Sequence, residues 1–425
     1  MKINRLMITA LLSIAATLLT AWLALNLSVG DKEIDTRLSR LYATDDAQFR
    51  RAMSHVLTPP MVPGNHVEAL INGDHIFAAM LDKIRAAKST ITFETYIFWS
   101  GSIGKTFADA LVERAKAGVK VHVMLDWIGG QIDDSFLRQM RDNGVQIRRY
   151  NAPHRTNLNV LNNRTHRKIL VVDGTTGFIG GVGIADVWRG NAQNPDHWRD
   201  THYRVTGPVV AQLQSAFIDN WLHTTGDVLH GAEYFPQLAS TGTHLAHVFT
   251  SSPGGGSESM QLMYLMALTA AADSIRISAS YFIPDDVAVK TLVAALDRGV
   301  KVQIILPGPY IDFEVVRWAS RATWGKLLAA GAEIYEYQPT MYHVKTLIVD
   351  ALWVSVGSTN FDNRSFSIND EANLNVYDPQ FAQSQIADFD RDRTKSRLVT
   401  FEEWASRKWH QKLLDAAASL LSSQL

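Results

Sequence analysis

The feature that most constrains this chain is a short sequence motif that occurs twice. His166 and Lys168 are followed by Asp173, and the same spacing, H-x-K-x4-D, recurs over 343–350. One copy of so short a motif would be weak evidence for any function. Two copies, each leading into an apolar run, indicate that two related halves of the chain form one site together.

The spacing within each copy indicates which side chains act together. A histidine and a lysine two residues apart lie on the same face of a β-strand. The segments 168–172 and 345–349 are β-branched and apolar, which predicts two buried strands. His166, Lys168, His343 and Lys345 are therefore the first catalytic candidates.

The aspartates of the motif, Asp173 and Asp350, are included among the catalytic candidates because they repeat with the histidines. Their odd spacing from the histidines, however, points their side chains to the opposite face of a regular strand. We therefore expect no contact between these aspartates and the histidines. Asp173-Gly174 is typical of the start of a hairpin turn, and Asp350 occupies the matching position.

The hairpin of the second copy predicts a substrate site. A two-residue loop at Ala351-Leu352 would place His343 opposite Asn360 and Lys345 opposite Ser358. The four side chains would then share one face and offer an imidazole, a cation and two hydrogen-bonding groups to a phosphate. Ser358 and Asn360 are thus predicted to bind substrate.

The first copy differs from the second at the matching positions. The same register pairs His166 with Gly183 and Lys168 with Gly181. Glycine offers only backbone donors, so the two halves are predicted to be similar without being equivalent.

Two acidic residues are candidates for orienting the histidines, because a catalytic histidine usually needs a carboxylate that fixes its tautomer. Glu371 follows His343 along the chain, and Asp200 follows His166. Chain order thus pairs each carboxylate with the histidine of its own half, Glu371 with His343 and Asp200 with His166. The alternative for each is a salt bridge, for example between Asp200 and Arg199.

The remainder of the body repeats as well. Residues 118–121 match 299–302, and residues 144–147 match 331–334; each follows a helical stretch and opens a β-branched strand. Each half reads as strand, helix, strand, helix, strand and catalytic hairpin. This order predicts an α/β fold of two pseudo-symmetric halves, with mixed sheets flanked by helices. We expect the halves at 61–245 and 246–425, after a linker at 31–60 that contains a short helix.

The N-terminal segment is uncharged over residues 6–30. About 20 apolar residues in a helix cross the ~30 Å hydrocarbon core of a bilayer. We therefore expect residues 1–30 to form one transmembrane helix, and Lys2 and Arg5 favour a cytoplasmic N-terminus with the body on the outer face. A cleaved signal peptide is the alternative.

The C-terminal stretch 401–421 is amphipathic. We expect a helix packed on the second half, and a membrane-binding helix is the alternative.

Composition removes some classes of function. The formal net charge of −1 gives no electrostatic argument for a nucleic acid partner. The chain has no cysteine, which excludes disulfides and thiolate metal sites. The sequence contains no cluster of histidine, aspartate and glutamate with the spacing of metal ligands, so neither a metal nor another cofactor is expected.

These motifs resemble those of the phospholipase D superfamily and, within it, the bacterial cardiolipin synthases. The resemblance extends over roughly residues 60–425, and the segment 360–366 favours the synthases over the nucleases of the superfamily. It is carried by HRKILVVDGTTGFIGG at 166–181, WRDTHYRVTGP at 198–208 and HVKTLIVDALWVSVGSTNFDNRSFSINDE at 343–371.

The resemblance implies a phosphatidyltransferase that makes cardiolipin from phosphatidylglycerol through a phosphohistidine, with His166 as nucleophile and His343 as acid and base. It implies membrane phospholipids as partners, with phosphatidylethanolamine a candidate beside phosphatidylglycerol, and a place in the inner membrane of a bacterium. The oligomeric state stays open. The alternatives are a phospholipase D that uses water as acceptor and a membrane-tethered phosphodiesterase or nuclease.

Overall fold

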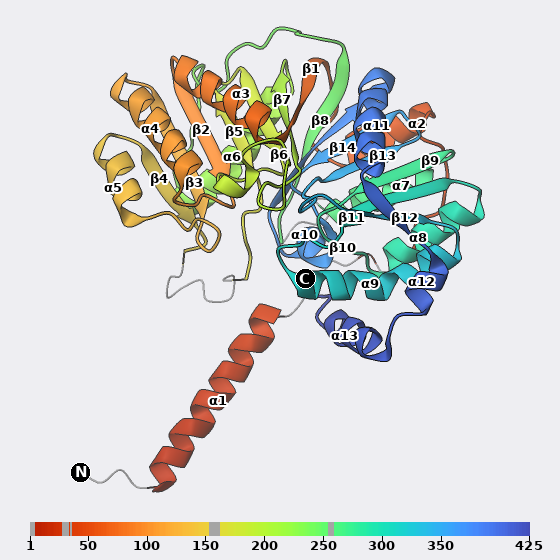
Figure 1. Ribbon diagram of the computed structural model, residues 1–425. Helices are drawn as coiled ribbons and strands as arrows, with labels where there is room; N and C mark the ends of the chain where they lie inside the picture. Colours follow the sequence, from red (N-terminus) through yellow and green to blue (C-terminus); the bar gives the residue numbers. More distant parts are fainter. Residues whose placement is uncertain (1–4, 28–33, 35, 153–161, 254–258) are drawn as a thin grey trace.

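A computed structural model describes residues 5–27, 34, 36–152, 162–253 and 259–425 of the protein (Figure 1). The body divides into two lobes that lie side by side, and helix α1 (Arg5–Leu27) extends away from them. The boundary predicted between the halves, at residues 245 and 246, falls within strand β8 (His244–Ser251). The division into halves at 61–245 and 246–425 therefore stays a prediction.

Fifteen strands of the described residues form one continuous sheet that runs through both lobes. Its order is β17-β12-β11-β9-β13-β14-β16-β8-β1-β7-β6-β5-β2-β3-β4, so the halves meet where β1 pairs with β8. The first half supplies β1 (Val62–Ile71), β2 (Thr90–Thr95), β3 (Lys120–Asp126), β4 (Gln146–Tyr150), β5 (Ile169–Val172), β6 (Thr176–Gly180) and β7 (Thr201–Thr206). The second supplies β8, β9 (Ser274–Ser278), β11 (Lys301–Pro307), β12 (Glu333–Tyr337), β13 (Thr346–Val349), β14 (Trp353–Gly357), β16 (Glu371–Tyr377) and β17 (Ser396–Val399).

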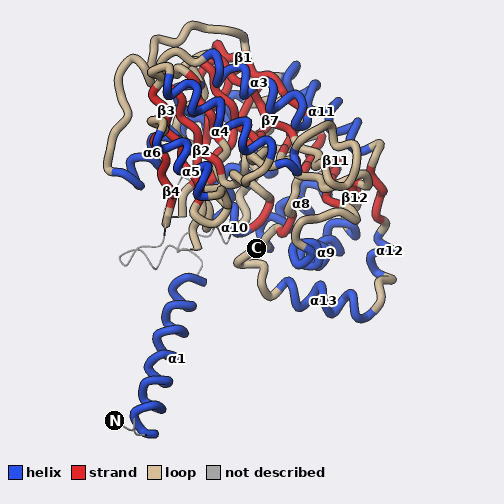
Figure 2. Tube along the Cα trace, turned by 60° about the vertical axis from the view of Figure 1, so that its left-hand side comes forward, coloured by secondary structure: helices blue, strands red, loops and turns tan. Residues whose placement is uncertain are grey.

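Helices cover both faces of this sheet (Figures 1 and 2). On one face, α3 (Asn72–Ala86), α4 (Ser102–Lys116) and α5 (Asp134–Asp142) pack on the first half, and α7 (Met260–Ala270), α8 (Asp286–Asp297) and α9 (Glu314–Ala329) pack on the second. On the other face, α6 (Val210–Thr225) and α11 (Pro379–Arg393) share one apolar cluster that includes strands of both halves. The halves are therefore joined through a common core as well as through the sheet.

Smaller elements complete the chain. They are α2 (Ala47–Val56), the short helix η2 (Asp186–Trp188), β10 (Phe282–Ile283) paired with β15 (Phe361–Asp362), α10 (Asn363–Ser367), α12 (Phe401–Ala405) and α13 (Trp409–Ser419).

The predicted α/β fold with two repeated halves is confirmed. Strands β5 and β13, which follow the two motifs, are buried along their whole length, as their apolar sequences predicted. Their neighbours β2 and β9 pair with them in the same antiparallel arrangement.

The predicted register of the catalytic hairpins is wrong by one residue. Thr346 pairs with Val356 and Val349 with Trp353, so three residues rather than two form the turn after β13. Asp350 lies in the turn with a φ of 52°. Its carboxylate accepts hydrogen bonds from the backbone N–H groups at the start of β9, and this contact draws the residue out of the ladder. The hairpin of β5 and β6 has the same register.

The N-terminal segment forms helix α1, whose apolar side chains over residues 7–22 are largely exposed. Within the described residues, no helix combines the length and apolar character needed to cross a bilayer, so the predicted transmembrane helix is not confirmed.

Candidate active site

The two histidines of the repeated motifs face one cavity of about 500 Å³ between the halves. His166 and His343 lie in the short segments that precede β5 and β13, where the chain crosses toward the other half. The cavity is lined by Tyr96, Ile97, Arg164, His166, Lys168, Trp188 and Trp198 of the first half, and by Tyr281, Asp312, Phe313, Val316, His343, Asn360, Asp362, Arg364, Asn369, Gln424 and Leu425 of the second.

Backbone hydrogen bonds between the halves position both histidines. The N–H of His166 donates to the carbonyl of Asp370 at 2.9 Å, and the N–H of His343 donates to the carbonyl of Arg199 at 2.8 Å. Asp370 and Arg199 are the residues that precede Glu371 and Asp200. Each histidine is therefore fixed, through the backbone, beside the acidic residue of the opposite half.

The histidines and carboxylates are paired across the halves, which corrects the assignment by chain order. Glu371 contacts Nδ1 of His166 at 2.9 Å, and Asp200 contacts Nδ1 of His343 at 2.7 Å. Both carboxylates are fully buried. An Nδ1–H that donates to a carboxylate leaves Nε2 as the free nitrogen of the ring. The orienting role stays a proposal, but the geometry it needs is present with the partners exchanged.

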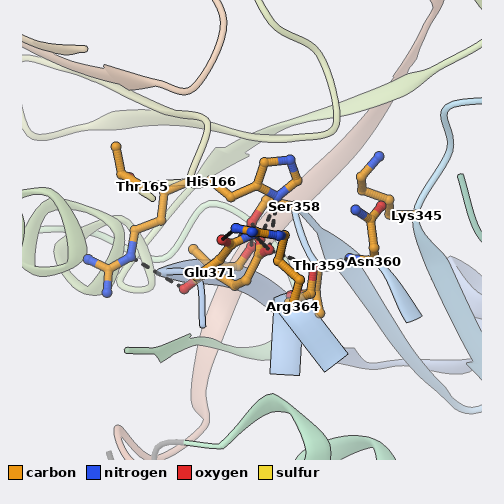
Figure 3. Close-up of polar contacts among 12 residues, drawn as sticks. Thr165, His166, Lys345, Ser358, Thr359, Asn360, Arg364 and Glu371 are labelled. Carbon is orange, nitrogen blue, oxygen red and sulfur yellow. Dashed lines mark hydrogen bonds and ion pairs between the residues drawn. The ribbon is translucent and has the colours of Figure 1, made fainter. Parts of the chain in front are cut away.

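Glu371 is held by several donors, as Figure 3 shows around the His166 ring. The hydroxyl groups of Ser358 and Ser365 both donate to its carboxylate. The hydroxyl oxygen of Ser358 also accepts a hydrogen bond from the backbone N–H of Ala372 at 3.0 Å, and the side chain is completely buried. The prediction that Ser358 binds substrate is therefore wrong, because its hydroxyl is committed to the carboxylate behind the histidine.

Asp200 has a different set of partners. Its carboxylate accepts hydrogen bonds from the indole N–H of Trp188 at 3.0 Å and from the backbone of Thr201 at 2.8 Å. Arg199, the alternative partner, instead forms an ion pair with Asp392 at 2.8 Å.

The two lysines occupy equivalent positions. Nζ of Lys168 donates to the carbonyl of His166 at 2.7 Å, and Nζ of Lys345 donates to the carbonyl of His343 at 3.0 Å. Lys345 also contacts the hydroxyl of Ser280 at 2.5 Å. Both side chains are buried, and two cations so close to the cavity favour an anionic ligand there.

Asn360 lies beside Lys345 (Figure 3) and lines the cavity. Its side-chain oxygen is buried and has no hydrogen-bond partner among the described residues, as expected for a group that contacts substrate. Its role as a substrate ligand therefore stays a prediction that the geometry supports.

The two ends of the cavity differ in chemistry. Near His166 lies the ring of Tyr96, whose hydroxyl accepts a hydrogen bond from Arg164. Near His343 lie the rings of Trp188 and Trp198, with centroids 5.3 and 5.5 Å from the imidazole. The sequence pattern did not predict that these residues belong to the site. None of them belongs to the repeated motif, and only Trp198 lies in a segment that carries the family resemblance, 198–208.

Asp173 and Asp350 are separated from the histidines, and their inclusion with the catalytic residues is corrected. The carboxylate of Asp173 accepts from the backbone N–H groups of Lys88, Ser89 and Thr90 at the start of β2. Asp350 makes the same contacts at the start of β9 and also accepts from the hydroxyl of Thr44. Both aspartates tie the far end of a catalytic hairpin to its neighbouring strand.

Burial dominates the ionisation of the site. It lowers the pKa of His166 to about 4, with Glu371 acting in the opposite direction. It also lowers the pKa of His343, that of Lys168 to about 7 and that of Lys345 to about 8. Burial alone would raise the pKa of Glu371, but the charges and hydrogen bonds of its partners outweigh burial and lower it to about 2. The free site thus holds a neutral His166 against an ionised Glu371 at neutral pH.

Within the described part of the chain, no three histidines and acidic residues are grouped so that they could hold a metal ion. The expectation of a reaction without metal or other cofactor stays a prediction.

Comparison with known proteins assigns the chain to a family. Residues 80–196 and 264–393 match the family described as "Cardiolipin synthase, PLD-like domain". The chain belongs to this phospholipase D-like family. It is 34% identical over 360 residues to cardiolipin synthase 2 of Bacillus anthracis, covering 84% of this chain and 70% of that protein. It is also 34% identical over 387 residues to cardiolipin synthase A of Pseudomonas syringae pv. syringae, covering 90% and 78%.

A solved structure confirms the fold independently of sequence. The crystal structure of phosphatidylserine synthase from Haemophilus influenzae superposes with a TM-score of 0.68 at 16% identity, covering 89% of this chain and all of that one. The family match supports the resemblance seen in the motifs, and the solved structure supports the fold.

Proposed function

We propose that the protein is a phosphatidyltransferase that makes cardiolipin from two molecules of phosphatidylglycerol. The observation that carries the proposal is the pair of carboxylate-held imidazoles, His166 and His343, that face one cavity with two buried lysines. The similarity to cardiolipin synthases supports the choice of substrate.

In the first step, Nε2 of His166 attacks the phosphorus of one phosphatidylglycerol. The nitrogen–phosphorus bond forms as the bond from phosphorus to the headgroup glycerol breaks. His343, in its protonated form, gives its proton to the departing glycerol oxygen. A neutral His166 suits this role because burial disfavours a second proton on its ring and so leaves Nε2 free to attack.

In the second step, a hydroxyl of another phosphatidylglycerol attacks the phosphohistidine. The neutral His343 accepts the proton of this hydroxyl, and the nitrogen–phosphorus bond breaks to free His166. The product contains two phosphatidyl groups joined through one glycerol. No nucleotide is consumed, because each phosphodiester bond that breaks is replaced by another.

The remaining residues stabilise charge. Lys168, Lys345 and the side chain of Asn360 contact the phosphate oxygens as negative charge redistributes in the transition state. Phosphate binding raises the pKa of both lysines again and keeps them charged. Glu371 and Asp200 stabilise the imidazolium forms of their partners.

We infer that the enzyme works at the inner membrane of a bacterium, on the outer face. A lipid substrate and the exposed apolar side chains of α1 support membrane association. The orientation of the body on the outer face is inferred from Lys2 and Arg5, which precede the apolar segment.

The test is product analysis of the purified protein with phosphatidylglycerol in detergent. We expect cardiolipin and glycerol in equal amounts without added nucleotide or metal. Phosphatidic acid as the sole product at every lipid concentration would identify a hydrolase. Cleavage of DNA or RNA without lipid transfer would identify the nuclease alternative.

A further inference from the structure

Helix α13 carries an apolar face that the body leaves uncovered. Trp409 is 76% exposed, Leu413 is 61% exposed, and Leu420, directly after the helix, is 84% exposed. These residues follow one another at helical spacing on a single face. Leu414 and Leu421 are exposed beside them. An apolar stripe of this kind on the surface marks a site of interaction.

The opposite face of α13 fixes the helix to the body. Asp415 is buried and forms ion pairs with Arg321 of α9 and with Arg407, both at 3.1 Å. Ala418 packs into the apolar cluster around Val316 and Ala319. α13 thus packs on the second half, as expected, but it does so through an aspartate and an alanine, and its large apolar side chains face solvent.

Cations border the exposed stripe. Lys408 and Lys412 are both exposed, one turn apart beside Trp409 and Leu413. Leucine and tryptophan flanked by lysine form the pattern of a helix that lies in the surface of an anionic bilayer. A two-fold contact between two copies of this face would bring the same lysines toward each other.

The stripe lies a few residues along the chain from the lining of the active-site cavity. The chain after α13 runs directly to the cavity, where Gln424 and Leu425 form part of the lining. The carbonyl of Gln424 accepts a hydrogen bond from Arg364 at 3.0 Å, which fixes this segment. α13 and α1 also lie at the same end of the body in both views (Figures 1 and 2).

We propose that the exposed face of α13 docks onto a bilayer of anionic phospholipid and brings the mouth of the cavity to the lipid headgroups. The inference rests on the proposed function for its choice of lipid. It explains why a helix held so firmly by its polar face keeps its large apolar side chains in solvent.

The absence of cysteine from the chain allows a direct test. Leu413→Cys in the full-length protein is labelled with an environment-sensitive fluorophore and mixed with vesicles of phosphatidylglycerol and phosphatidylcholine. We expect a blue shift in emission and quenching by lipids brominated near the headgroup, both weaker with pure phosphatidylcholine. Lys116→Cys on α4, labelled in the same way, is the control and should not respond.

A second measurement connects docking with turnover. Trp409→Ser combined with Leu413→Ser should lower cardiolipin synthesis on vesicles about fivefold or more, while synthesis from dispersed short-chain phosphatidylglycerol stays within about twofold. Leu222→Ser, at another exposed leucine, is the matched control and should change neither rate. Thermal unfolding of each variant reports whether the fold is kept.

Each contrary result has a distinct meaning. A label at Leu413 that ignores lipid, or equal losses on both substrates, would overturn the docking proposal. A label that responds to protein concentration without lipid would identify an interface between copies and would also overturn it. If the labelled Leu413→Cys protein responds to lipid but the wild-type protein makes no cardiolipin, the proposed function is refuted and the docking surface still stands.

Discussion

The two ends of the catalytic cavity contain the same parts in different surroundings. His166 meets Glu371, which is held by two serine hydroxyl groups. His343 meets Asp200, which is held by an indole N–H and a backbone N–H. Each half supplies a histidine to its own end and a carboxylate to the other. Neither half alone contains a complete histidine–carboxylate pair.

One pair of equivalent positions shows how the halves diverged. Ser358 of the second motif donates a hydrogen bond to Glu371. Gly181, its counterpart in the first motif, lies against Asp200 so closely that an added Cβ would be 2.4 Å from a carboxylate oxygen. The same backbone position supports one carboxylate through a hydroxyl group and makes room for the other by having no side chain.

Removal of either imidazole should give the largest effect. His166→Ala and His343→Ala should each lower turnover by about 10³-fold or more, because one forms the bond to phosphorus and the other moves the proton. Cardiolipin formation, measured with the fold monitored by circular dichroism, checks this. Accumulation of a phosphatidylated protein by His343→Ala alone would assign the nucleophile to His166. Near wild-type transfer by either variant would disprove the two-histidine mechanism.

The crossed carboxylates come next. Glu371→Gln and Asp200→Asn should each lower turnover by about 10²-fold through loss of the ionised partner of an imidazole. NMR can test the crossed pairing. Glu371→Gln should shift the ring signals of His166, and Asp200→Asn should shift the ring signals of His343. Shifts confined to the histidine of the same half would contradict the arrangement.

The glycine of the first motif should have an intermediate effect. Gly181→Ala should lower kcat about tenfold, because its methyl group displaces the carboxylate that orients His343. The matched change Ser358→Ala should cost only a few-fold, since Glu371 keeps the hydroxyl of Ser365. A comparison of kcat and KM for the two variants tests this order. The reverse order would mean that the hydroxyl at 358 contributes more than the space at 181.

The acid limb of the pH profile of kcat/KM should lie at lower pH than that of an ordinary histidine. Because burial lowers the pKa of His166 to about 4, its nucleophilic form is kept as pH falls below 6.5 and is lost only as pH falls through about 4. The profile of kcat/KM between pH 3.5 and 8 checks this. A nucleophile limb near pH 6.5 would indicate an imidazole in contact with bulk water.

The turn aspartates should give the smallest effect on activity. Asp173→Asn and Asp350→Asn should leave kcat within about threefold but lower the free energy of unfolding by about 1–3 kcal/mol, because three N–H groups lose an ionised acceptor. Denaturant unfolding measures the loss of stability, and turnover of the same preparations measures any loss of activity. A large loss of activity with unchanged stability would return these aspartates to the active site.

Much of this architecture follows from the sequence alone. Alternation of strands and helices predicted the α/β halves, and apolar runs predicted β5 and β13, because both patterns are local. The duplicated motif predicted that His166 and His343 share one cavity. Odd spacing predicted that Asp173 and Asp350 avoid the histidines.

Only the tertiary structure decided which carboxylate faces which histidine. Asp200 ends the segment before β7, and Glu371 begins β16; both elements reach the opposite half because β1 pairs with β8 in one sheet. The role of Ser358 was predicted wrongly for a related reason. Asp350 in the turn binds the start of β9, and the hairpin register differs by one residue from the predicted one. Spacing along a chain encodes which face a side chain takes within an element. The choice between two similar partners depends on how whole elements are assembled in space.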